Sequence, residues 1–183
     1  YTFTAKIGAL TSNDIVVIVG EKSDFIVKEI TNGYEIIGYI GISREVKIPE
    51  KIYDKSVTSI GERAFYGKAL TSVIIPDSVT NIGYEAFSYN ELTNITIPKS
   101  VTSIDSMAFY YNELTSLIID NGVTSIGDYV FNKNPLTSVI IGNSVTAMGY
   151  NAFGNHLTSV TFDSDFAINN FKEVFADSAK SVK

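Results

Sequence analysis

The sequence predicts a repeat solenoid: a right-handed array of 22-residue units, each with one short parallel β-strand and one short helical turn, preceded by an N-terminal β cap. Two regular spacings carry this prediction. One column of phenylalanines recurs every 22 residues, at Phe65, Phe87, Phe109, Phe131 and Phe153. A column of leucines follows it, at Leu70, Leu92, Leu114, Leu136 and Leu157, where only the last interval is one residue shorter. A unit of this length cannot bury its own apolar face, so the units must stack around one core.

Each leucine opens a predicted strand. Leu70, Val73 and Ile75 have the L-x-x-L-x-L spacing of a leucine-rich repeat strand, and the period of two turns Val73 and Ile75 to one face. The following segment carries apolar residues at i, i+4 and i+5, as in Ile82, Ala86 and Phe87. This spacing suits one helical turn that packs inward.

Polar and small residues mark the turns between these segments. An asparagine stands two residues before each later leucine, at Asn90, Asn112, Asn134 and Asn155. Asparagine tolerates a left-handed backbone and bonds to neighbouring backbone groups, so we expect both here. Four units carry glycine after the V-T-S-I segment, at Gly61, Gly83, Gly127 and Gly149. We expect close backbone approach or special dihedral angles at these positions.

The two ends depart from the period. Residues 14–19, 25–30 and 34–40 read as strands, and Asn32-Gly33 is a tight-turn signal. We therefore expect residues 1–41 to be an N-terminal β-hairpin cap over the exposed edge of the first unit, with the tail of a preceding module as the alternative. Residues 42–183 then form the array, whose last unit is degenerate. The spacing over residues 170–179 predicts a helix that covers this last unit.

Units of the form L-T-S-V-x-I-P-x-S-V-T-S-I-G-x-x-A-F-x-x-N resemble the BspA-type leucine-rich repeats of bacterial surface proteins. The resemblance covers about residues 42–183. It implies a secreted or cell-surface protein that binds other proteins, including host matrix or cell-surface partners. The family has no common catalytic residues, so the resemblance assigns no active site to this chain.

Composition excludes several other classes of function. The 14 basic and 20 acidic residues give a net charge of −6, which argues against binding to nucleic acid or anionic membranes. No apolar run is long enough to insert into a membrane, and the chain has no cysteine. Gly20-Glu21-Lys22-Ser23 lacks the glycines of a phosphate-binding loop, and His156, the only histidine, reads as an exposed turn residue. We therefore predict no enzyme, no catalytic residue, no metal and no cofactor.

The start of the chain bears on its origin. The sequence has neither an initiator methionine nor a signal-like segment at its start, so we expect a trimmed or mature segment of a longer protein. Whether the parent chain continues past Lys183, and whether it carries an anchor or a catalytic domain there, stays open.

The candidate site is the outward face of the predicted strands. Residues between the inward positions point outward and stack in two columns. They are Ser72, Asn94, Ser116, Ser138 and Ser159 in one column, and Ile74, Thr96, Ile118, Ile140 and Thr161 in the other. The isoleucines form an apolar patch that marks an interaction site, or they simply favour strand formation.

The leading functional prediction is an adhesion module that presents this extended sheet face to protein partners. The alternative is a structural spacer that holds another domain away from the cell wall. A carbohydrate-binding module is less favoured, because the outward columns lack the aromatic platforms on which sugars stack. The identity of the ligand and the oligomeric state stay open.

Overall fold

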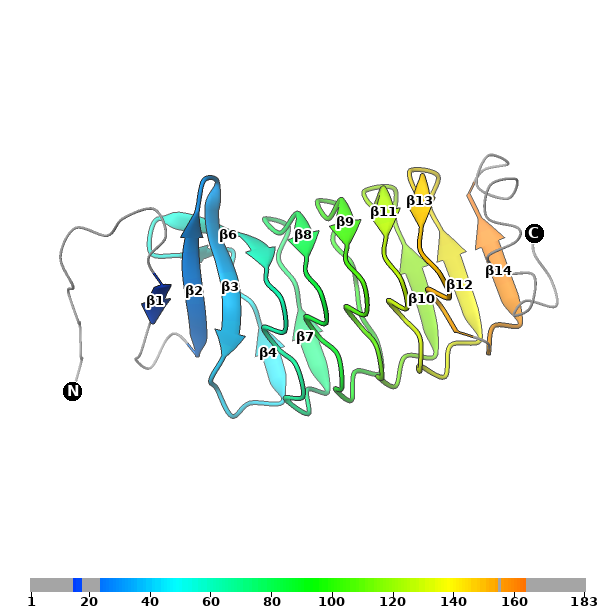
Figure 1. Ribbon diagram of the computed structural model, residues 1–183, viewed down its shortest axis with the longest axis horizontal. Helices are drawn as coiled ribbons and strands as arrows, with labels where there is room; N and C mark the ends of the chain where they lie inside the picture. The colour runs from blue at the N-terminus through cyan, green and yellow to red at the C-terminus, as the bar shows by residue number, and fades with distance from the viewer. Residues whose placement is uncertain (1–14, 18–23, 155, 164–183) are drawn as a thin grey trace.

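The computed structural model describes residues 15–17, 24–154 and 156–163, and in this part of the chain it is a β-solenoid without a helix. The coils lie side by side in one row along the long axis of the molecule (Figure 1). The strands are β1 (Ile15–Val17), β2 (Phe25–Ile30), β3 (Gly33–Tyr39), β4 (Glu45–Lys47), β5 (Lys51–Ile52), β6 (Lys55–Ile60), β7 (Ser72–Ile74), β8 (Asn81–Ile82), β9 (Ser103–Ile104), β10 (Ser116–Ile119), β11 (Ser125–Ile126), β12 (Ser138–Ile141), β13 (Ala147–Met148) and β14 (Ser159–Phe162).

Most coils contribute two short strands, where the sequence predicts one. The strands of the V-T-S-I segments, β6, β8, β9, β11 and β13, continue the N-terminal strands in one long sheet. Its order is β1-β2-β3-β6-β8-β9-β11-β13, with β5 paired to β6. The strands that follow the leucines, together with β4, form the smaller sheets β4-β7 and β10-β12-β14. Strands of successive coils pair in parallel and in register, so that Ile60, Ile82 and Ile104 lie directly beside one another. Equivalent residues of successive units therefore stack, as predicted.

The predicted helical turn is wrong, and the backbone hydrogen bonds show why. The amides of Arg63 and Phe65 donate to the carbonyls of Tyr84 and Ala86 in the next coil, at 2.9 and 2.8 Å. Between them, the amide of Ala64 donates within its own coil. This alternation replaces the i to i−4 bonds of a helix. It also requires a left-handed residue at Arg63 (φ 54°) and at the equivalent positions of the next four coils.

A stack of phenylalanine rings forms the centre of the core. Phe65, Phe87, Phe109, Phe131 and Phe153 are buried and lie nearly parallel, with ring centroids 4.9 to 5.4 Å apart. The hairpin of β2 and β3 covers the first ring of the stack. The ring centroids of Phe25 and Tyr39 lie 6.2 and 5.5 Å from that of Phe65. β3 continues the long sheet by pairing in parallel with β6. The division into a cap of residues 1–41 and an array of residues 42–183 stays a prediction.

Buried asparagines join neighbouring coils at the turns. The side-chain oxygen of Asn112 accepts a hydrogen bond from the Leu92 amide at 3.1 Å. Its nitrogen donates to the carbonyls of Phe87 and Phe109, at 2.9 and 3.1 Å. The expected bonds to backbone are thus present at Asn90, Asn112 and Asn134, but none of these three has the expected left-handed backbone, and Asn155 lies outside the described residues. The preceding residue, Tyr111 in this coil, takes that conformation (φ 56°) and turns the chain so that the asparagine amide points inward.

The glycines after the V-T-S-I segment allow close approach of successive coils. A Cβ atom on Gly127 would lie 2.5 Å from the Ser106 backbone nitrogen of the preceding coil. Gly127 itself does not have a positive φ angle, so close approach is the reason for glycine here. The predicted helix over residues 170–179 and the degenerate last unit lie outside the described residues.

Candidate functional site

The ten predicted site residues all lie on one face of the solenoid, at alternate positions with the buried residues of the same segments. Eight of them are carried by β7, β10, β12 and β14, while Asn94 and Thr96 lie between β7 and β10. The register places Ser116, Ser138 and Ser159 side by side, and it aligns Ile118, Ile140 and Thr161 in the same way.

Three isoleucines are the apolar part of this face. Ile74, Ile118 and Ile140 are 56%, 59% and 44% exposed, whereas their neighbours Val73 and Val139 are buried. A β-branched side chain has few rotamers to lose, so its burial against a partner costs little conformational entropy. These side chains are therefore suited to act as apolar anchors.

The face is interrupted between β7 and β10. Residues 93–98 are not part of a strand, so Ser72 and Ile74 belong to a different sheet from the site residues at 116 and beyond. Asn94 stands where the other coils have serine, and asparagine is depleted in strands. Thr96 separates Ile74 from Ile118 in the stacked order. The structure therefore brings Ile118 and Ile140 together and leaves Ile74 apart.

Two residues of this face were missed at the level of sequence. β4 pairs with β7 so that Glu45 lies beside Ser72 and Lys47 beside Ile74. Both are exposed, and they give the N-terminal end of the face a charged character that the later coils lack. The sequence does contain a pattern that predicts these two residues. Val46-Lys47-Ile48-Pro49 repeats the pattern of residues 73–76, so Glu45 and Lys47 each extend one of the two outward columns by one residue.

The ionisable groups with shifted pKa values lie away from this face. A hydrogen bond to Glu29 raises the pKa of Lys55, and a hydrogen bond to Glu85 raises the pKa of Arg63. Within the described residues, no cluster of three histidine, aspartate or glutamate side chains is placed to hold a metal ion. The same part of the chain contains no helix with the length and apolar character of a membrane span. The face therefore offers shape, apolar contact and hydroxyl groups.

Stacked coils with paired parallel strands define the chain as a solenoid repeat protein. The chain belongs to the BspA-type leucine-rich repeat family, whose model matches residues 43–176 in six copies. The predicted resemblance is thereby confirmed. A comparison with curated protein sequences finds no match.

Solved structures of bacterial leucine-rich repeat proteins share the fold. The Treponema pallidum leucine-rich repeat protein TpLRR is 28% identical with a TM-score of 0.72, over 78% of this chain and 70% of that one. A leucine-rich repeat protein from Bacteroides capillosus is 23% identical with a TM-score of 0.56, over 74% of this chain and 97% of that one. The pneumococcal vaccine antigen PcpA is 18% identical with a TM-score of 0.59, over 88% of this chain and 47% of that one.

Proposed function

We propose that this chain is a secreted or cell-surface module that binds a protein partner through the exposed sheet face of β7, β10, β12 and β14. The observation that carries the proposal is the set of three exposed isoleucines, Ile118 and Ile140 on one sheet and Ile74 on a second, along a face otherwise lined mainly by serine, threonine and asparagine. The family supports it, because BspA-type repeats are characteristic of surface proteins that bind other proteins. The proposed role is recognition and involves no catalytic step.

The geometry suggests which coils contribute most. Ile118 and Ile140 are direct neighbours in the register of β10 and β12, so together they present one apolar area. A few buried residues near the centre of an interface contribute most of its binding energy, while the surrounding residues exclude water. We therefore place the centre of the interface on β10 and β12, with the serines and threonines as its rim. Glu45 and Lys47 form a charged outer edge at the first coil.

The test is a binding assay with the triple variant Ile74→Lys, Ile118→Lys and Ile140→Lys. The wild-type chain is immobilised and exposed to purified extracellular matrix and cell-surface proteins. We expect a partner to bind the wild type and to be lost from the triple variant, because three lysines replace the apolar anchors with hydrated charges. Ile42→Lys is the matched control, since Ile42 is fully exposed and lies outside the face.

The alternative function, a spacer, gives the opposite result. The uniform columns of the array would serve as a rigid rod with no need for an apolar surface. A spacer predicts that the triple variant folds and behaves like wild type in every binding assay. Equal binding by wild type, triple variant and Ile42→Lys would therefore reject the sheet face as the binding surface.

A further inference from the structure

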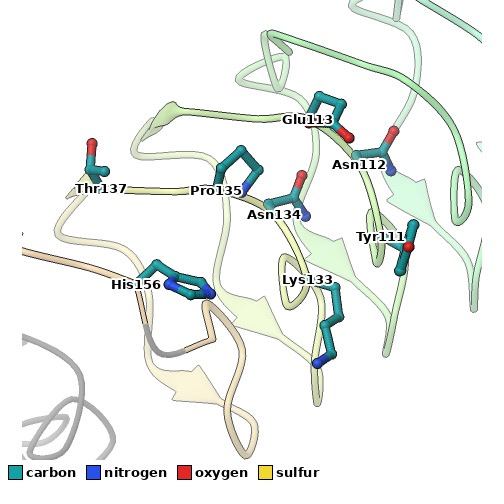
Figure 2. Close-up of a pocket in the computed structure, with 8 residues that line it drawn as sticks. All are labelled: Tyr111, Asn112, Glu113, Lys133, Asn134, Pro135, Thr137 and His156. Atoms are coloured by element: carbon teal, nitrogen blue, oxygen red, sulfur yellow. The ribbon is translucent and has the colours of Figure 1, made fainter.

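A second surface lies at the turn edge of the solenoid, where the chain enters β12, and includes none of the ten residues of the sheet face. It is a hollow of about 520 Å³, which is within the range of small-molecule sites. Figure 2 shows the residues that line it, which come from three successive turns. They are Tyr111, Asn112, Glu113, Lys133, Asn134, Pro135, Thr137 and His156.

The sequence itself creates a change in the repeat here. Four residues separate phenylalanine and leucine in the earlier turns, but only three separate Phe153 from Leu157. The bonds between turns also change. The amides of Glu91 and Glu113 donate to leucine carbonyls of the preceding coil, at 2.8 and 3.0 Å, whereas Pro135 at the next equivalent position has no amide hydrogen. The hollow therefore coincides with the point at which the repeat becomes irregular.

Tyr111 presents one aromatic face to this hollow. Its other face stacks on Tyr89, with ring centroids 5.1 Å apart and an angle of 14° between the planes. The equivalent position in the next unit is Lys133, so the tyrosine column ends at Tyr111. The side chain is 53% exposed and lines the hollow. An exposed aromatic face is a platform on which an apolar ligand surface packs.

The charges around the hollow are unusual for this chain. Lys133 and His156 are the only basic residues of the described chain between residues 100 and 163, and both line the hollow. Neither makes an ion pair among the described residues. In the view of Figure 2, the Glu113 carboxylate lies on the opposite side of the hollow from the Lys133 ammonium. The site thus combines an aromatic face, two nitrogen donors for an anion, and a carboxylate acceptor.

We propose that this hollow binds an acidic sugar, a pyranose that carries a carboxylate, at the end of a glycan. The C–H face of the ring packs on Tyr111, the carboxylate accepts hydrogen bonds from Lys133 and His156, and a ring hydroxyl donates to Glu113. A peptide with a terminal carboxylate fits less well. Peptides commonly bind by adding a strand to a free sheet edge, and the hollow is lined by turns instead of such an edge. The inference is independent of the sheet face.

The test is an NMR titration of the full chain with glucuronic acid and with N-acetylneuraminic acid. Glucose serves as the neutral sugar, and acetyl-glycyl-glycine serves as the peptide carboxylate. We expect millimolar binding of the two acidic sugars, as is usual for a shallow site, with weaker binding of the other two probes. Absence of binding by both acidic sugars would overturn the proposal. Equal binding of acetyl-glycyl-glycine would overturn it in favour of a peptide site.

Variants assign the binding to the hollow. Lys133→Gln and Tyr111→Asn should each weaken binding of the acidic sugars about tenfold. Asparagine is chosen because it tolerates the left-handed backbone of Tyr111. Tyr53→Asn is the matched control, since Tyr53 is also an exposed left-handed tyrosine and lies outside the hollow. Unchanged affinity in both hollow variants would place the sugar elsewhere and overturn the assignment. Ile118→Lys on the sheet face should leave sugar binding intact, which separates this test from that of the proposed function.

Discussion

Replacing Asn112 with alanine should destabilise the solenoid by about 4 kcal/mol. The substitution leaves the buried amide of Leu92 without a partner, which costs about 1–3 kcal/mol. It also removes two hydrogen bonds to carbonyl groups, worth about 1 kcal/mol each. The carbonyls of Phe87 and Phe109 keep one bond each, from Asn90 and Asn134, so they add no penalty for an unpaired group.

Urea unfolding followed by circular dichroism and tyrosine fluorescence measures this loss, since the chain has no tryptophan. We also expect the Tm to fall by about 10 °C in a chain of this size. Asn94→Ala is the matched control, because Asn94 is exposed and its side chain makes only a long contact with Thr93 at 3.4 Å. If both variants unfold at the same urea concentration, the buried asparagines do not join the coils in the way described.

Three further perturbations test other parts of the fold. Phe109→Ala opens a cavity in the ring stack and should cost about 3–5 kcal/mol in calorimetry, whereas the exposed Tyr150→Ala should change little. Gly127→Ala forces a Cβ atom against the Ser106 backbone and should cost about 1–3 kcal/mol in urea unfolding; a neutral result would show that the coils lie further apart. Burial, reinforced by the Asp24 carboxylate, raises the pKa of Tyr39, so the folded state retains a proton that the unfolded state releases above about pH 10. Stability should therefore fall as pH rises above 10, with a shallower fall of the Tm in Tyr39→Phe; equal slopes would contradict this.

Much of the interior could be predicted from the sequence, because the core is a repeated pattern. The phenylalanine and leucine columns are buried as expected, and the alternation in Val73, Ile74 and Ile75 places the isoleucine outward. Because the units stack in register, residues at the same position of successive units form a column in space. The neighbours of a residue therefore follow from its position in the unit. The outward placement of Ile74, Ile118 and Ile140 was therefore accessible before the structure.

The helical turn was mispredicted because two backbone conformations are compatible with the same spacing of apolar residues. Apolar residues at Ile82, Ala86 and Phe87 turn inward either on a helix or on two successive turns that bond to the next coil. Spacing reports the side-chain directions and not the partners of the backbone amides, and here neighbouring coils supply those partners. The same limit applies to the second strand that most coils contribute, because this strand forms only by pairing with another coil.

The hollow at the turn edge was not predictable for a different reason. Tyr111, Lys133 and His156 occupy irregular positions of the repeat, and a repeat-based reading treats such departures as variation in turns. Their proximity follows from the stacking of three turns, including one shortened by a residue. The sequence showed only an isolated histidine at a turn, and the structure brings it together with Tyr111 and Lys133 around one space.

Deletion of one complete coil tests the central claim most directly, namely that the 22-residue unit is a structural repeat that contacts only its neighbours. Removal of residues 90–111 joins Tyr89 to Asn112 and restores the pattern of the unit across the junction. We predict that this shortened chain folds, with a strand-type circular dichroism spectrum and a cooperative thermal transition. Removal of only residues 90–100 breaks the period and should abolish both. The claim is contradicted if the deletion of a full unit unfolds the chain as completely as the deletion of half a unit.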